Sequence, residues 1–169
     1  DGFLIFRNCL DDAICKEAKN FVLGSLEPLI GPAELEVDVG YPGAPAGDKE
    51  VGNETPRRLL HAYGRAAIMR RMALHENVRH VIYELMEEKS VMLSQCHHNC
   101  VMTKFPKYSS TTGWHQDIRY WHFDLPELVS VWIALDREDE LNGALQVIPG
   151  SHKVDFVRGD FDKEWFFRE

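Results

Sequence analysis

The spacing of apolar residues changes near Val91, and this change limits the folds that are open to the chain. Before it, apolar side chains recur at helical intervals, which predicts helices from Asp11 or Asp12 to Glu27, over residues 63–74 and over 75–88. After it, short apolar or β-branched runs separated by turn residues predict strands over 91–95, 99–104, 129–135 and 144–148. Helices followed by strands indicate an α+β chain, with a helical flank over about residues 10–90 and a sheet-rich half over about 91–169.

The remaining segments predict two shorter strands and one long loop. The strands are expected over residues 2–7 and 35–39. Between Gly40 and Pro56 the chain is rich in glycine, proline and acidic residues, which is typical of a loop. A loop of this length is unusual in a compact domain, so we expect it to be either a functional lid or disordered.

Size and charge exclude several classes of function. The 169 residues fit one domain, and a net charge of -8 argues against binding to nucleic acid or to an anionic membrane surface. No apolar run approaches the roughly twenty residues that a membrane span requires. Four cysteines are too few for a disulfide scaffold, and no secretory signal is visible, so we expect a reducing intracellular compartment, the cytoplasm. Because the first residue is Asp1, we also expect the natural chain to begin upstream.

The tetrapeptide Trp114-His115-Gln116-Asp117 carries the strongest chemical pattern. In an extended segment, residues two apart point to the same side, so the imidazole of His115 and the carboxylate of Asp117 would face one ligand while Gln116 faces away. One histidine and one carboxylate are two of the three groups in the facial set that holds non-haem Fe(II). We therefore predict that His115 and Asp117 bind iron and take part in catalysis.

A second pattern lies downstream and makes a resemblance specific. It comprises Asn142-Gly143-Ala144-Leu145 and Pro149-Gly150-Ser151-His152-Lys153, preceded by Val131-Trp132-Ile133-Ala134-Leu135-Asp136. Together with His115-Gln116-Asp117 and Tyr120, these residues resemble the phytanoyl-CoA dioxygenase family of Fe(II)/2-oxoglutarate oxygenases. The opening Asp1-Gly2-Phe3-Leu4-Ile5 is also similar to the start of that family. The resemblance covers most of the chain and is sharpest over residues 104–153.

This resemblance implies a fold, a cofactor set and a site. The fold would be a double-stranded β-helix, a cupin-like jelly roll, behind the N-terminal helices. Fe(II), 2-oxoglutarate and dioxygen would take part, and a small organic substrate would leave hydroxylated. His115 and Asp117 would be iron ligands; Cys100, Met102 and Lys104 would line the 2-oxoglutarate pocket, and Trp132 the same barrel. Core packing is the alternative role for Met102 and Trp132. Family members that halogenate lack the carboxylate, so Asp117 favours hydroxylation.

The family's third iron ligand and the arginine that pairs with 2-oxoglutarate have no counterpart in this sequence. In the family, the histidine at the position of His152 belongs to a turn rather than to the metal. About six strands are predicted where a jelly roll needs about eight. We therefore expect a single oxygenase domain over residues 1–169 that is incomplete at its C-terminal side, with the missing ligand supplied by the natural protein.

Three functions remain open at this point. The first is an Fe(II)/2-oxoglutarate hydroxylase acting on a small organic molecule or an acyl thioester. The second is a catalytically inert family member that serves as a binding module. The third is a cupin-like iron enzyme that does not use 2-oxoglutarate and takes His152 or His122 as third ligand. The sequence identifies neither the substrate nor the oligomeric state.

Two further clusters have ordinary structural explanations. The run from Cys96 to Cys100 has the composition of a zinc site, but a strand and turn with buried thiols is favoured, and His98 could then face the iron site. Six arginines could bind a carboxylate or phosphate, but we expect them to form a solvated helix face. They are Arg57, Arg58, Arg65, Arg70, Arg71 and Arg79.

Overall fold

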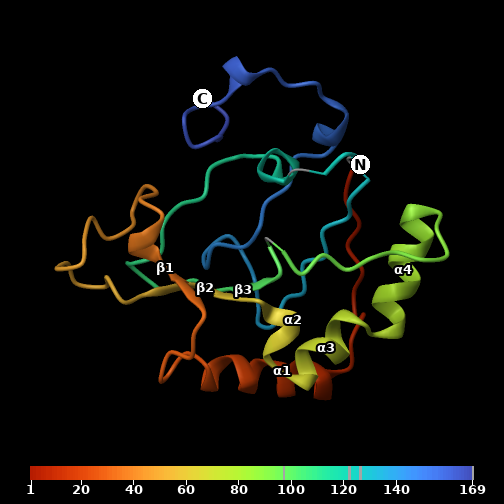
Figure 1. The fold of residues 1–169 in the computed structure, drawn as a ribbon, viewed down its shortest axis with the longest axis horizontal. Helices are drawn as coiled ribbons and strands as arrows, with labels where there is room; N and C mark the ends of the chain where they lie inside the picture. The colour runs from red at the N-terminus through yellow and green to blue at the C-terminus, as the bar shows by residue number, and fades with distance from the viewer. Residues whose placement is uncertain (97, 122, 126, 169) are drawn as a thin grey trace.

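The computed structural model describes residues 1–96, 98–121, 123–125 and 127–168. In this part of the chain, helices pack against a three-stranded antiparallel sheet, so the fold is α+β (Figure 1). The strands, in sheet order, are β1 (Ala33–Leu35), β2 (Pro56–Leu60) and β3 (Cys100–Met102). The helices are α1 (Asp12–Gly24), α2 (Ala62–Arg65), α3 (Ala67–Ala73) and α4 (Glu76–Met86). Within the described ranges, no helix is both long enough and apolar enough to cross a bilayer.

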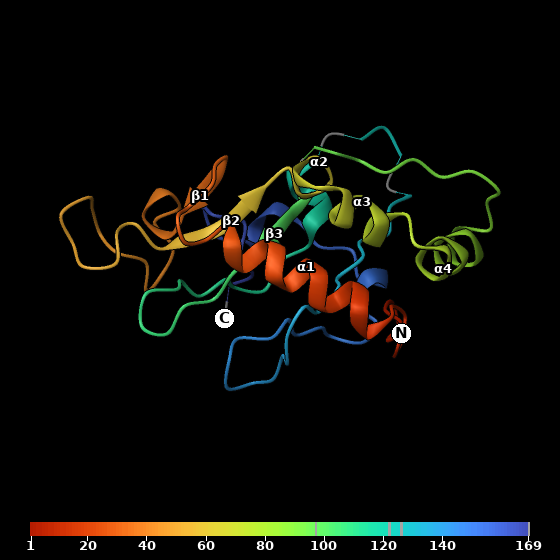
Figure 2. The same ribbon diagram turned by 90° about the horizontal axis from the view of Figure 1, so that it is seen from below.

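Helix α1 confirms the first predicted helix. Asp11 has extended backbone and precedes the first turn, as expected for the residue that caps a helix. Ile14, Ala18 and Val22 are buried along one face at helical spacing. Figure 2 shows α1 in front of the strands when the molecule is seen from below, so this helix covers one face of the sheet.

The second helical region is broken into more pieces than its periodicity predicts. The predicted helix over 63–74 is divided at Ala66, whose extended backbone (φ -156°, ψ 162°) ends α2 and precedes α3. Helix α3 buries Ile68, Met69 and Met72 against α1, and α4 lies to one side of this packing (Figures 1 and 2). Helices are therefore present where they were predicted, with a corrected boundary, but β1 and β2 also fall within the predicted helical flank.

The central strand β2 was not predicted, because two arginines interrupt its apolar pattern. Its buried Leu59 pairs with Ala33 and Val101 on the side of α1, and all three belong to the core. On the opposite face, Arg58 lies between Glu34 and Met102. The sheet therefore turns Leu59 towards the helices, whereas Arg58, Cys100 and Met102 lie on its other face.

Four predicted strands are wrong for the described structure. The segments 2–7, 91–95, 129–135 and 144–148 contain no strand residues, and the prediction over 35–39 is replaced by β1 and a 3₁₀ turn over Glu36–Asp38. In the predicted sheet-rich half, β3 is the one strand found among the described residues. A strand forms only where a neighbour accepts and donates its backbone hydrogen bonds, and sequence patterning cannot supply that neighbour.

The central position of Leu59 leads to a stability prediction. Leu59 is 0% exposed in the core, whereas Leu141 is 97% exposed. We expect Leu59→Ala to lower the free energy of unfolding by about 2–5 kcal/mol, because it leaves a cavity between the sheet and α1. Leu141→Ala should change it by less than about 0.5 kcal/mol. Urea titration followed by circular dichroism measures both; equal effects would contradict the assigned core.

Candidate metal centre

His115 and Asp117 face each other, although they do not share a strand. Gln116 has extended backbone, as the sequence predicts, but Asp117 already begins a 3₁₀ turn over Asp117–Tyr120. The Nε2 atom of His115 nevertheless lies 3.2 Å from Oδ1 of Asp117. The two groups that the sequence singled out are thus brought together by one extended residue and a turn.

The second ring nitrogen of His115 determines what can lie between these groups. Nδ1 lies 2.8 Å from the carbonyl oxygen of Gly113, which only accepts hydrogen bonds, so Nδ1 carries the hydrogen. In a neutral ring, Nε2 then has a lone pair that faces the lone pairs of Asp117 Oδ1. Two facing acceptors are stable only with a cation between them, either a proton on His115 or a metal ion.

A third side chain, His98, approaches the same carboxylate oxygen. Its Nδ1 lies 3.5 Å from Asp117 Oδ1, and its ring packs edge-on against Trp121 with centroids 5.1 Å apart. Burial works to raise the pKa of Asp117, but hydrogen bonds from His115 and His98 outweigh it and hold the pKa well below its usual range. Across the described ranges, no three His, Cys, Asp or Glu side chains are arranged to hold a metal ion.

Aromatic rings pack against His115, and of these the sequence analysis named only Tyr120. Phe166 is 8% exposed and contacts His115 edge-on with centroids 5.9 Å apart, and Tyr120 makes a similar contact. Tyr41 packs on Phe166 from the start of the long loop, with centroids 4.9 Å apart. A Cβ on Gly113 would lie 2.9 Å from the ring of Phe166, so only glycine allows this approach. No local spacing links these residues, so no sequence pattern could have revealed these contacts.

The four residues predicted to line the 2-oxoglutarate pocket lie in different parts of the structure. Cys100 and Met102 belong to β3, Lys104 follows that strand, and Trp132 lies outside the sheet. Cys100 and Met102 lie on the same face of β3, with their sulfur atoms 3.9 Å apart. Burial is the main cause that raises the pKa of Cys100, and the nearby Asp117 carboxylate adds to it. The ammonium of Lys104 donates to the carbonyl of Ser110 at 2.7 Å. Trp132 is half-exposed and donates to Glu138.

The sequence profile of one protein family, Phytanoyl-CoA dioxygenase (PhyH), matches residues 1–168, which is nearly the whole chain. The chain belongs to the phytanoyl-CoA dioxygenase family. This membership confirms the family that the motifs around His115 and Asn142 predicted. No solved structure matches the chain significantly.

Curated proteins match shorter stretches. An L-proline trans-4-hydroxylase of Streptomyces griseoviridis is 42% identical over 48 residues, which cover 26% of this chain and 18% of that protein. Ectoine dioxygenases of Streptomyces avermitilis and Streptomyces anulatus are each 48% identical over 45 residues, which cover 24% of this chain and 15% of those proteins. The matched stretches thus span less than a fifth of each relative.

In this phytanoyl-CoA dioxygenase family member, His152 is placed away from any ligand role. A Cβ on Gly2 would overlap the imidazole ring of His152, and the backbone N–H of Gly150 donates to the carbonyl of Asp1 at 2.7 Å. The ring therefore packs on the first residues of the chain. His122, the other candidate for a third ligand, lies outside the described residues.

The predicted solvated arginine face is wrong for three of its members. Arg57 is 3% exposed, pairs with Glu34 at 2.6 Å and lies 4.0 Å from the fully buried Glu36. Arg58 also pairs with Glu34, at 3.2 Å. Arg65 donates to the carbonyls of residues 30, 32 and 60. The reason is tertiary, since β1 and the turn after it bring Glu34 and Glu36 across from β2, and the chain after α1 brings backbone carbonyls to α2.

Glu36 connects this ion network to the segment that leads into the metal centre. Its Oε2 accepts hydrogen bonds from both the backbone N–H and the hydroxyl of Ser110, at 3.0 and 2.6 Å. The long loop joins the same segment, because the N–H of Thr111 donates to the carbonyl of Pro42 at 2.8 Å. The loop that the sequence suggested as a lid is thus packed beside residues 109–111, and a lid function stays a prediction.

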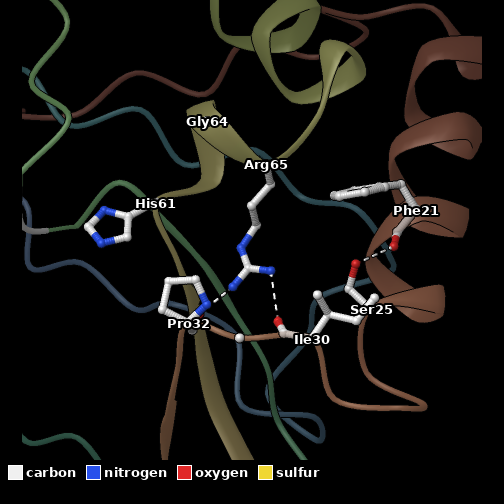
Figure 3. A pocket seen from close by; sticks show the side chains of 8 residues that line it. Phe21, Ser25, Ile30, Pro32, His61, Gly64 and Arg65 are labelled. Atoms are coloured by element: carbon white, nitrogen blue, oxygen red, sulfur yellow. Dashed lines mark hydrogen bonds between the residues drawn. The ribbon is translucent and has the colours of Figure 1, made fainter.

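A separate pocket of about 360 Å³ lies between α1, residues 30–32 and α2. Figure 3 shows Arg65 reaching across it towards Ile30 and Pro32, with Phe21 and His61 on either side. None of the residues predicted to bind iron or 2-oxoglutarate lines this pocket. The donors of Arg65 are directed at backbone carbonyls, so its clearest role is to hold the turn after α1 in place.

The buried ion network leads to a second prediction. Arg57→Met removes the counter-ion of the buried Glu36, so we expect the free energy of unfolding to fall by about 3–5 kcal/mol. The double variant Arg57→Met/Glu36→Gln should recover part of that loss, because glutamine buries no charge. Lys19→Met removes an exposed pair with Asp136 and should lower the stability far less than Arg57→Met does. Urea denaturation measures all three, and a double variant no more stable than Arg57→Met would show that Glu36 does not depend on Arg57.

Proposed function

We propose that this chain carries the iron-binding motif of an Fe(II)/2-oxoglutarate-dependent hydroxylase. One observation carries the proposal: the Nε2 atom of His115 lies 3.2 Å from a carboxylate oxygen of Asp117, with the ring fixed by Gly113. Roughly 3 Å is the separation expected for two donors bound side by side to one transition-metal ion with bonds of about 2.1 Å. An imidazole and a carboxylate are also the donor types that non-haem Fe(II) selects. The residues present therefore fit the metal that the family implies.

The roles of this chain's residues follow from their positions. His115 and Asp117 hold the metal, and the Gly113 carbonyl keeps the imidazole in the tautomer that leaves Nε2 free to bind. Bound Fe(II) with 2-oxoglutarate and dioxygen supplies the oxidant for hydroxylation. Phe166 and Tyr120 exclude water from the buried side of His115. Cys100, Met102, Lys104 and Trp132 are proposed to line the 2-oxoglutarate pocket.

The proposed fold of the whole protein is a double-stranded β-helix, with residues 1–169 in a single oxygenase domain. Apolar side chains of the predicted strands support it, because they are about half exposed in the described structure: Val131, Trp132, Val147 and Ile148. Large apolar side chains that are this exposed ordinarily mark a surface that packs against another element. These segments are the ones that we expect to form barrel strands when paired.

The substrate class is a small organic molecule. The matched relatives are named for proline and ectoine, and the family is named for an acyl thioester of coenzyme A. The metal ligands do not select a substrate, whereas the shape of the surrounding pocket does. Small amino-acid-like molecules are therefore tested first and acyl thioesters second.

Metal binding by the motif gives the direct test. We expect His115→Ala and Asp117→Ala to reduce the affinity for Fe(II), or for Co(II) as an air-stable substitute, by at least about tenfold to a hundredfold, because each removes a donor. His80→Ala changes an exposed histidine on α4 and serves as the matched control. Titration followed by Co(II) absorption measures the affinities. Unchanged affinity in either site variant would contradict the ligand assignment.

Cosubstrate turnover then separates the remaining functions. With Fe(II) bound, a 2-oxoglutarate oxygenase converts some 2-oxoglutarate to succinate even without its main substrate. Succinate formation that depends on His115 supports the hydroxylase. Iron binding without any succinate in the full-length protein would instead favour an iron enzyme that does not use 2-oxoglutarate, or an inert binding module.

A further inference from the structure

His98 is the second imidazole at the Asp117 carboxylate, and the ligand pair His115 and Asp117 does not account for it. We propose that His98 is a positioning residue: its Nδ1–H donates to Oδ1 of Asp117 and fixes the carboxylate in the orientation that binds the metal. This inference rests on the proposed metal site.

The contact itself has the chemistry of a hydrogen bond from the ring to the acid. Nδ1 of His98 lies 3.5 Å from Oδ1 of Asp117, and an ionised carboxylate can only accept, so the ring must be the donor. Oδ1 has two lone pairs. It can therefore accept a hydrogen bond from His98 with one lone pair and bind an ion shared with Nε2 of His115 with the other. Both imidazoles can therefore act on one oxygen without competing.

The backbone holds His98 in place independently of the site. The neighbouring Asn99 is fixed to the start of α2, because its carbonyl accepts from the N–H of Ala62 at 2.9 Å and its side chain accepts from the N–H of Tyr63 at 2.8 Å. The side-chain NH₂ of Asn99 also donates to the carbonyl of Ser94. The edge-on contact with Trp121 then fixes the ring of His98. His98 is thus directed at Asp117 by elements other than the metal motif.

The same geometry argues against His98 as a third ligand. Within the part of the chain that the structure describes, no three acidic, histidine or cysteine side chains are placed to hold one metal ion. The Nδ1 hydrogen that donates to Asp117 also occupies the nitrogen that a metal would need on that side of the ring. Groups that hydrogen-bond to a metal ligand typically contribute a factor of about 10–100 to metal affinity, because they fix the ligand's orientation.

The positioning role of His98 is tested by substitutions that distinguish the loss of its hydrogen-bond donor from a change in the size of its side chain. His98→Leu and His98→Phe remove the donor, and phenylalanine keeps a ring against Trp121, whereas His98→Gln retains an N–H donor. We expect both non-donor variants to weaken Co(II) binding by about 10–100-fold, and His98→Gln to restore affinity to within about threefold of the starting chain. The Co(II) absorption bands of His98→Gln should keep their positions, because His98 is not a ligand. His80→Leu is the matched control.

The outcomes distinguish this inference from the proposed function. Non-donor variants that bind Co(II) as tightly as the unsubstituted chain would overturn the positioning role. So would a His98→Gln variant that is as weak as His98→Leu, or one whose absorption bands shift, because either result makes the imidazole itself a ligand or a packing element. If instead His115→Ala leaves Co(II) binding unchanged, the metal site itself is wrong. Circular dichroism of each variant identifies any that fail to fold, and His98→Phe replaces His98→Leu in that case.

Discussion

The arrangement of the site depends on two electron-rich atoms that face each other at short range. Nε2 of His115 and Oδ1 of Asp117 are 3.2 Å apart, and the ring of His115 cannot turn its other nitrogen to the acid without breaking its bond to Gly113. Neither group satisfies the other unless a cation lies between them. The surrounding structure therefore has to hold both groups at this distance so that one cation can lie between them.

Three separate parts of the chain supply this restraint. Phe166, which comes late in the sequence, packs edge-on against the ring of His115. The buried Glu36 and Arg57 hold Ser110, and with it the segment that runs towards Gly113. From the side of α2, Asn99 fixes His98 against the acid. A buried charge network is a costly way to fix a loop, but it tolerates less variation in geometry than apolar packing does.

The sequence predicted features that depend on neighbours along the chain. The i, i+2 spacing of His115 and Asp117 was sufficient to predict that they meet, even though the backbone between them is only partly a strand. Helix α1 followed from its own periodicity. By contrast, β2 was missed because Arg57 and Arg58 look solvated until β1 brings Glu34 beside them. Phe166 and Glu36 gain their roles only from residues far away in sequence, and the strands predicted beyond residue 120 need partners that patterning cannot provide.

The contact between Gly2 and His152 has a consequence for how the molecule assembles. These residues are far apart in sequence, and during synthesis the ribosome releases the first long before the second exists. The contact of Gly2 therefore cannot form until His152 has been synthesised. The helices and the sheet can form before it, from contacts between residues that are closer in sequence. Closing so long a loop is entropically unfavourable and slow, so we expect the contact between Gly2 and His152 to form late on the folding pathway. Phe3, Leu4 and Ile5 are 42–65% exposed even after this contact has formed, so a chaperone that binds apolar segments would find them accessible throughout folding.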